Sequence, residues 1–375
     1  MVALVIGGAG YIGSHVARAL QRSGHTPLIY DNLSTGHSFL ANGFELVRGD
    51  ILDQPNLASV LRRVDAVMHF AAHAHVGESV TNPRKYFRNN VEGGLSLLNA
   101  AIDVGVKKIV FSSTCAVYGE PSHVPIAENT SRQPVNPYGV SKLFFEQALE
   151  AFDRAYGLRF ASLRYFNAAG ADESGDIGEL HDPETHLIPL ALQAAAGIGP
   201  ELQVFGSDYP TPDGTCIRDY IHVNDLADAH VKAIEHLEGG NPSFAANLGT
   251  GRGHSVKEVI STVEEVTGNP VPRRMGPRLG AGRRLHLGPR RAAPFGRPLR
   301  GGDALLPRLA REIRTLPLRG AGGGLRAGAR RPAPGPHPRR RSGLRPPPRP
   351  RRPHHEPAHG GRHRGTRRAL RSRAR

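Results

Sequence analysis

Cysteine and long apolar runs are scarce in this chain of 375 residues. The only two cysteines, Cys115 and Cys216, are too few for the disulfide framework of a secreted protein, which favours a reducing compartment. No apolar run approaches the roughly 18 residues of a membrane-spanning helix, and no basic segment precedes the first apolar run. We therefore expect a cytoplasmic protein that neither enters a membrane nor is exported.

One part of the chain also has no lysine and very few acidic residues. Residues 1–270 carry 19 Lys and Arg against 30 Asp and Glu, whereas residues 271–375 carry 30 Arg, no Lys and only three carboxylates. The formal net charge of +16 therefore comes entirely from the last part. Helical and strand periodicity stops near Pro272, and Arg, Pro, Gly, Ala and His dominate from there on. Because such a composition cannot bury a core, we expect residues 275–375 to form a disordered basic tail.

Two origins of this tail are open. A genuine basic arm would bind RNA or another polyanion non-specifically through its charge, and nucleic-acid binding is expected in no other form. A GC-rich coding sequence read out of frame would give the same composition.

A glycine-rich turn organises the N-terminal part of the chain. An apolar run at residues 2–6 stops at Gly7-Gly8-Ala9-Gly10-Tyr11-Ile12-Gly13, and a helical pattern of apolar residues follows. Gly7, Gly10 and Gly13 suit the sharp turn, the close approach to a pyrophosphate and the tight helix packing of a dinucleotide site. A second apolar run ends in Asp31, whose carboxylate can accept both ribose hydroxyls and would repel a 2′-phosphate. Together these features predict NAD as the cofactor.

Further apolar runs alternate with helical patterns, which predicts an α/β fold with a doubly wound, Rossmann-type parallel sheet. Strands are expected near residues 44–51, 65–70, 108–111 and 160–165, and a long amphipathic helix over 83–104. Asp50 would lie at the same sheet edge as Asp31 and meet the adenine, or else cap the helix at 56–61. His73 and His75 have no further ligands beside them, so no metal site is expected.

Hydroxyl and phenol groups mark a candidate reaction site. The strand at 108–111 leads to Ser112-Ser113-Thr114, whose hydroxyls can bind a substrate oxygen or simply cap the strand end. Farther along, Asn136-Pro137 opens a helix that places Tyr138 and Lys142 on one face. Because a nearby ammonium stabilises a phenolate, Lys142 is expected to lower the pKa of Tyr138. Tyr138 is then a candidate general base for a hydroxyl group, although the same spacing also occurs in surface pairs.

The second half of the chain is expected to complete the site. Residues 1–165 would form the NAD-binding domain, and residues 166–274 a smaller, partial α/β domain for the substrate. The parallel alternation fades beyond residue 170, and residues 171–185 form an acidic loop over the mouth of the site. Arg218, with Tyr220 nearby, could hold a diphosphate and stack a base, or Arg218 could pair with Asp219.

These motifs together resemble the extended short-chain dehydrogenase/reductase family, and within it the nucleotide-sugar epimerases, over about residues 1–275. The glycine turn marks only the superfamily, whereas the stretches 76–80, 165–167 and 205–209 are more specific. The resemblance implies an isomerase of galactose metabolism that interconverts UDP-glucose and UDP-galactose by transient, NAD-dependent oxidation at C4 of the sugar. It also implies a homodimer formed through two long helices.

The resemblance assigns the site residue by residue. Catalysis falls to Tyr138, Lys142 and Thr114. The implied NAD contacts are Gly7, Gly10, Tyr11, Ile12, Gly13, Asp31, Asn32, Asp50, Ile51, Phe70, Ala71, Asn89, Lys142 and Phe166. The implied substrate contacts are Thr114, Tyr138, Asn167, Leu187, Phe205, Arg218 and Tyr220. Two positions depart from the family pattern, which often has lysine in place of Ala74 and asparagine in place of His186.

Related chemistries stay open as alternatives. Nucleotide-sugar dehydratases need an extra acid and base beside the strand-end hydroxyl, where this chain has Cys115-Ala116. Epimerisation is therefore favoured over dehydration. A UDP-sugar decarboxylase, an epimerase for another nucleotide sugar, and a polyanion-binding protein acting through its tail are the alternatives.

The tail bears on this expected activity. In the family, the remaining part of the substrate domain should lie where the tail begins, and it is missing from this sequence. Its absence favours out-of-frame translation and predicts an incomplete substrate site with weak or no activity.

Overall fold

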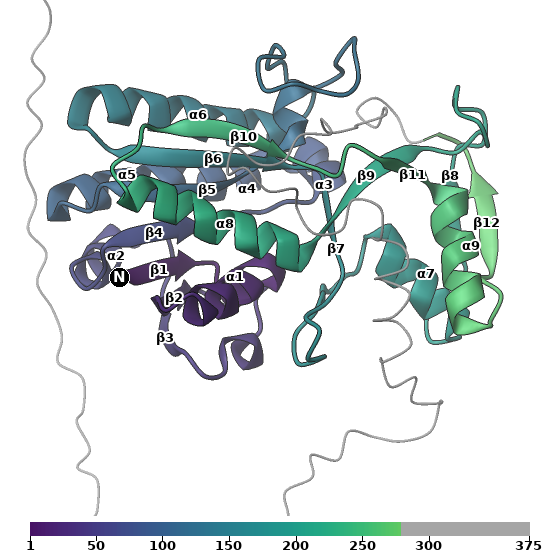
Figure 1. The fold of residues 1–375 in the computed structure, drawn as a ribbon. Coiled ribbons are helices and arrows are strands. Elements are labelled where there is room, and N and C mark those ends of the chain that lie inside the picture. The colour runs from purple at the N-terminus through teal and green to yellow at the C-terminus, as the bar shows by residue number, and fades with distance from the viewer. Residues whose placement is uncertain (279–375) are drawn as a thin grey trace, which may run out of the picture. The chain divides into compact units, whose positions relative to one another are not determined.

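A computed structural model describes residues 1–278 of the chain (Figure 1). The predicted tail therefore lies outside the described residues, apart from residues 275–278. The largest element is a seven-stranded sheet with the strand order β10-β6-β5-β4-β1-β2-β3, in which every pair is parallel. Its strands are β1 (Val2–Ile6), β2 (Thr26–Asp31), β3 (Glu45–Arg48), β4 (Ala66–His69), β5 (Lys108–Thr114), β6 (Arg159–Tyr165) and β10 (Phe244–Leu248).

Helices cover both faces of this sheet. The cluster around Ala3 and Val5 packs against α1 (Tyr11–Arg22) and α8 (Val223–Glu238). The alternate residues Leu4 and Ile6 pack on the opposite face against α2 (Gln54–Leu61), α5 (Gly93–Val104) and α6 (Pro137–Tyr156). Burial on both faces explains why the strands read as continuous apolar runs, and it confirms the predicted doubly wound fold. Within the described residues, no helix has the length and apolar character needed to cross a membrane.

The predicted helix over 83–104 is confirmed in its extent, but its middle is not a regular α-helix. It consists of α4 (Pro83–Tyr86), a π-helical segment η2 (Phe87–Glu92) and α5. Asn90, inside the π-helical segment, bonds both backbone groups of His73 and donates to Ser141 Oγ at 3.0 Å. A π-turn widens the helix locally, and here it accompanies an amide that bonds the loop after β4. Other short helices are η1 (Ser38–Ala41), α3 (Val76–Thr81) and η3 (Cys115–Tyr118).

The second half of the chain contributes to two smaller sheets and returns to the large one. One small sheet has the order β11-β9-β7, and the other pairs β12 with β8. Their strands are β7 (Asn167–Ala169), β8 (Leu202–Phe205), β9 (Ile217–His222), β11 (Gly253–Ser255) and β12 (Arg273–Gly276), accompanied by α7 (Leu187–Ala195) and α9 (Val256–Thr267).

Two expectations for this half need correction. The parallel alternation does not end near residue 170, because β10 pairs in parallel with β6 and α8 packs on the large sheet. Regular structure also continues just past Pro272, because β12 pairs with β8. The predicted domain limits at residues 165 and 274 remain predictions.

Candidate active site

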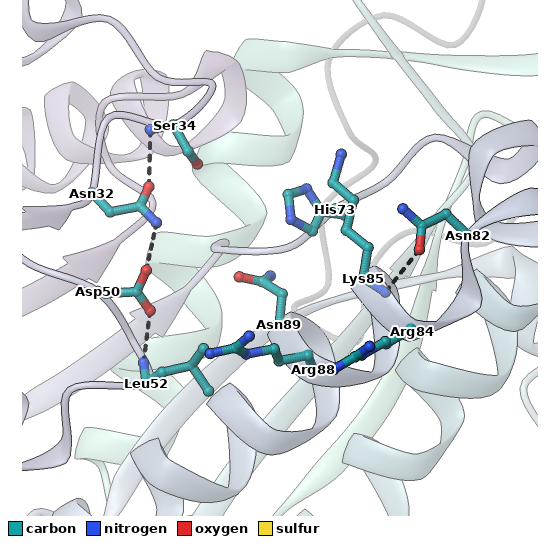
Figure 2. Close-up of a pocket in the computed structure, with 10 residues that line it drawn as sticks. All are labelled: Asn32, Ser34, Asp50, Leu52, His73, Asn82, Arg84, Lys85, Arg88 and Asn89. Carbon is teal, nitrogen blue, oxygen red and sulfur yellow. Dashed lines mark hydrogen bonds between the residues drawn. The ribbon is translucent and has the colours of Figure 1, made fainter.

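The carboxyl ends of the parallel strands open into one large cavity. In register, Ile6 of β1 pairs with Tyr30 and His69, so the ends of three strands coincide. The cavity has a volume of about 1110 Å³ and extends from the glycine turn to β8 and β9. Every predicted site residue except Asp50 lines it. Asp50 instead lines a smaller neighbouring pocket, to which Asn32 and Asn89 also contribute (Figure 2).

The glycine turn has the steric requirements of a dinucleotide site. Gly7 has φ +80°, and a Cβ there would lie 2.6 Å from the backbone nitrogen of Ala71. A Cβ on Gly13 would collide with the carbonyl oxygen of Gly7, because α1 packs directly on the turn. Gly10 caps the N-terminus of α1, and a Cβ there would meet only an ordinary contact at 3.4 Å. Gly10 therefore leaves the helix N-terminus accessible from the cavity, where free N–H groups can bind a phosphate.

Asp31 and Asp50 end neighbouring strands but have different partners. The buried carboxylate of Asp31 accepts hydrogen bonds from the backbone nitrogens of Ala9 (3.0 Å) and Leu33 (2.8 Å), which fixes it against the glycine turn. Figure 2 shows Asn32 donating to Asp50 Oδ2 at 2.9 Å, while Leu52 donates to Asp50 Oδ1. Asp50 does not cap the helix, since α2 is capped by Asp53. The helix-cap alternative for Asp50 is therefore wrong.

Tyr138, Thr114 and Lys142 meet at the end of β5. Asn136 caps α6 by accepting a hydrogen bond from Gly139 at 2.9 Å, which places Tyr138 and Lys142 in the first turns. Thr114 and Tyr138 both line the cavity, and the Thr114 side chain acts on the Tyr138 phenol by lowering its pKa. Lys142 is 4% exposed, donates to the carbonyl oxygen of Ser112 at 2.8 Å, and has its Nζ 6.0 Å from the Tyr138 ring centre. The sequence-predicted reaction residues are thus brought together.

Burial shifts the pKa values of both Tyr138 and Lys142. Removal from water raises the pKa of Tyr138 well above its usual value, and the neighbouring Thr114 side chain only partly opposes this rise. The predicted lowering of the Tyr138 pKa by Lys142 is therefore not found, because desolvation of the phenol is the largest influence on that pKa. Burial also lowers the pKa of Lys142 to about 7, although the charge of Glu146 acts in the opposite direction.

The three strand-end hydroxyls have separate roles. Of the three, Thr114 is the one whose side chain acts on the Tyr138 phenol. Ser112 Oγ bonds the phenol of Tyr165, and Ser113 Oγ donates to Glu146 Oε1 at 2.5 Å. Glu146 is in turn held by Arg164 through two charged hydrogen bonds of 2.8 and 2.7 Å. This buried ion pair fixes the backbone of β5 behind the site, and sequence reasoning did not find it because its partners are distant along the chain.

The opposite wall of the cavity comes from the second half of the chain. Asn167 donates to the carbonyl oxygen of Asp219 at 2.7 Å, which joins β7 to β9. Arg218 and Tyr220 follow on β9, and burial raises the pKa of Tyr220. The Asp219 carboxylate, the alternative partner for Arg218, accepts three hydrogen bonds from Thr250 and Gly251. It thereby holds the loop that follows β10.

Known proteins resemble this chain in both sequence and structure. The family model for the NAD dependent epimerase/dehydratase family matches residues 3–249, which span the glycine turn, the Tyr138 site and β10. The chain belongs to this family. A curated relative from Rhizobium meliloti (strain 1021), named UDP-glucose 4-epimerase, is 53% identical over 269 residues, which cover 71% of this chain and 82% of that protein.

Solved structures of other epimerases support the family assignment. A UDP-glucose 4-epimerase from Brucella ovis in complex with NAD is 52% identical, with a TM-score of 0.75, and the match covers 77% of this chain and 90% of that chain. A UDP-glucose 4-epimerase from Bifidobacterium longum in complex with NAD⁺ and UDP is 37% identical, with a TM-score of 0.77 and coverage of 84% and 97%.

Several residues that line the cavity of this epimerase/dehydratase family member were not predicted. Tyr165 lies beside the predicted Phe166 at the end of β6, where the strand-end rule could have found it. Tyr209 lines the cavity on the side of β8. Glu179 and His181 come from the acidic loop, and their alternation with Glu184 and His186 was the available signal.

Proposed function

We propose that this protein interconverts UDP-glucose and UDP-galactose by NAD-dependent, transient oxidation at C4 of the sugar. The observation that carries the proposal is that Tyr138, Thr114 and Lys142 line one cavity, which begins at the glycine turn. Many relatives at about half sequence identity bear the name of this activity. No net oxidation results, so the same cofactor can serve each turnover.

The cofactor site fits NAD on steric and electrostatic grounds. Gly7 and Gly13 have no room for a side chain, Gly10 leaves the N-terminus of α1 open, and Asp31 presents a carboxylate where a ribose would lie. Bound NAD would supply an acceptor and donor of hydride for C4, together with a positive charge on its nicotinamide ring. The remaining proposed contacts are Tyr11, Ile12, Asn32, Asp50, Ile51, Phe70, Ala71, Asn89, Lys142 and Phe166.

Tyr138 and Thr114 would handle the proton of the sugar 4-hydroxyl. Tyr138 would take this proton as general base and return it as general acid, while Thr114 holds the same oxygen. Because burial keeps the Tyr138 pKa high, the phenolate needs positive charge nearby, which a protonated Lys142 would provide. A charged group in a site from which water is excluded interacts strongly with its neighbours, because the local dielectric constant is low.

The far wall of the cavity would hold the nucleotide. Arg218 would bind the diphosphate and Tyr220 would contact the base, with Asn167, Leu187 and Phe205 as further contacts. Holding the diphosphate while the 4-keto sugar turns would expose both faces of C4 in succession. This need for a fixed anchor and a mobile sugar fits a cavity that is much larger than a single sugar ring.

The deciding experiment replaces Tyr138 with Phe. We expect turnover of UDP-galactose to fall by roughly 10²- to 10⁴-fold, the usual contribution of a general acid–base group, while NAD stays bound. Tyr156→Phe is the matched control, because Tyr156 is an exposed tyrosine at the other end of the same helix. Unchanged turnover in the Tyr138→Phe variant would refute the assignment. Release of CO₂ from a UDP-uronic acid, or epimerisation of another sugar only, would favour the alternatives.

We also infer that the chain acts as a cytoplasmic homodimer. Val140 and Phe144 lie four residues apart on α6 and are 39% and 43% exposed. Exposed large apolar groups at this spacing form a stripe that a second helix can cover. Light scattering on the purified chain measures whether its mass is twice 40.4 kDa.

The predicted weakness of the activity concerns residues outside those described, so it stays a prediction. The relevant measurement is kcat/KM for UDP-galactose, compared with the Rhizobium meliloti relative under the same conditions. A value equal to that of the relative would contradict an incomplete substrate site.

A further inference from the structure

A second cluster of reactive side chains lies in the loop between β7 and α7. Glu179, His181, Glu184 and His186 each present one donor atom, and the four donor atoms lie within 4.8 Å of one another. The four residues fall within eight positions of the sequence, so one loop supplies the whole cluster. The resemblance described above has asparagine rather than histidine at position 186, so it does not imply this arrangement.

The contacts within this loop cluster converge on two carboxylates. His186 Nδ1 lies 2.8 Å from Glu179 Oε1 and 2.9 Å from Glu184 Oε1. His181 Nδ1 lies 3.3 Å from the same oxygen of Glu179 and 3.7 Å from Glu184 Oε2. The carboxylate side chains are only 9% and 8% exposed. Two nearly buried carboxylates thus share two imidazole nitrogens at the centre of the loop.

Protons alone do not satisfy this arrangement. The His181 Nδ1 atom is buried without a hydrogen-bond partner of acceptable geometry, although it faces both carboxylates. A proton on a ring nitrogen bonds along one direction, whereas a cation at the centre contacts all four donors at once.

We propose that Glu179, His181, Glu184 and His186 form a binding site for one divalent transition-metal ion of the Zn²⁺ type. Two imidazole nitrogens and two carboxylate oxygens are a ligand set that suits Zn²⁺ and not Mg²⁺, which prefers oxygen alone. Zinc bonds of about 2.0 to 2.2 Å in a tetrahedral site place the donors roughly 3.4 Å apart, so small side-chain rotations close the cluster. With four protein ligands the site is structural in type.

The position of the loop cluster indicates what the metal does. His186 is the N-cap residue of α7, and Leu187 follows it on the wall of the main cavity. Glu179 and His181 line the same cavity, and His181 packs edge-on against Tyr11 of α1 at a ring distance of 6.2 Å. A bound ion ties residues 179–186 together and fixes the start of α7. It therefore holds the loop at the mouth of the cavity without touching Tyr138.

The test is a titration of the metal-free full chain with Zn²⁺ against a chromophoric chelator. We expect the wild-type chain to bind one Zn²⁺ ion at this site. The double variant His181→Gln/His186→Gln should lack this ion. His123→Gln and His354→Gln/His355→Gln are the controls, since they remove histidines elsewhere, and both keep that ion. Co²⁺ in place of Zn²⁺ should give the visible absorption of a four-coordinate site in wild type and in the controls.

Two results would overturn the proposal. One is equal Zn²⁺ binding by wild type and the His181→Gln/His186→Gln variant, and the other is no stoichiometric binding by wild type, which would leave a protonated ion-pair network. Retention of NAD shows whether the His181→Gln/His186→Gln variant is folded. If this variant does not fold, the Glu184→Gln variant takes its place in the titration. None of these readouts depends on sugar turnover, so failure of the metal site and failure of the proposed epimerase activity are separate outcomes.

Discussion

At the scale of single residues, burial sets the charge of several side chains. Lys142 donates to the carbonyl oxygen of Ser112 inside the protein, and burial lowers its pKa to about 7. His15 of α1, His69 of β4 and His230 of α8 are buried as well. Loss of hydration lowers their pKa values to about 4, 3 and 4, respectively. All four groups are therefore shifted toward their neutral forms.

The buried histidines predict acid sensitivity. The folded pKa of His69 lies below the unfolded value of 6.5, so the unfolded state binds more protons between those two values. The stability is complete above pH 6.5 and is lost as the pH falls toward 3, at about 1.4 kcal/mol per pH unit for each such group. The His69→Leu variant should lose less free energy of unfolding per pH unit than wild type. The difference corresponds to the uptake of one proton fewer on unfolding.

Urea unfolding at a series of pH values between 7 and 4 measures this slope. His123→Leu is the control, because His123 is exposed and bonds only its neighbour Ser122 among the described contacts. An identical slope for wild type and His69→Leu would show that His69 takes up no proton on unfolding.

At the scale of elements, helix α6 is the one that assembles the reaction site. Its N-cap residue Asn136 and the following Pro137 fix where the helix begins, and this start sets the positions of Tyr138 and Lys142. The cap is buried, and its hydrogen bond to Gly139 has the ordinary length of 2.9 Å. The start of the helix therefore sets where both proposed catalytic side chains lie.

Replacing Asn136 with Ala tests this role. We expect a loss of about 1 kcal/mol in the free energy of unfolding, because one backbone N–H loses its acceptor. Turnover should fall as well, since Tyr138 lies in the turn that loosens. Asn136→Asp keeps an acceptor and should restore both quantities. Asn82→Ala is the comparison, and its cost should be smaller because its bond to Lys85 is 3.4 Å long.

Sequence reasoning succeeded for elements whose signal is local. The parallel strands and the positions of Asp31, Thr114 and Tyr138 follow from apolar runs and from the rule that strand ends share one edge. The return of β10 to the sheet could not be predicted, because it depends on pairing with β6 some eighty residues earlier. The π-helical segment coincides with the bond from Asn90 to Ser141, fifty-one residues along the chain, which no local pattern encodes.

The candidate site shows the same division. Which residues line the cavity was largely predictable, because strand ends and a helix start deliver them. Their protonation was not, since the Tyr138 pKa depends on how completely the phenol is buried. The loop cluster was visible only as an alternation of Glu and His, and its convergence depends on the path of residues 179–186.

At the scale of the whole molecule, charge divides the chain into an acidic part and a basic one. Residues 1–270 carry more carboxylates than basic groups, whereas residues 279–375, outside the described part, carry 27 arginines and three carboxylates. A polyanion would therefore be attracted by the last segment and repelled by the rest. NAD binding, by contrast, is proposed to rely on residues that all precede position 167.

Removing residues 279–375 separates these two properties. We expect the shortened chain to lose its retention on immobilised RNA, which for the full chain should fall steeply with added salt because arginines release counterions from the phosphates. Retention of NAD should be unchanged, since the glycine turn, Asp31 and Lys142 remain. If RNA retention survived the truncation, the acidic part would have to contain a binding surface of its own. If NAD retention fell instead, the last segment would be needed to hold the cofactor cavity together, and an out-of-frame origin for it would be untenable.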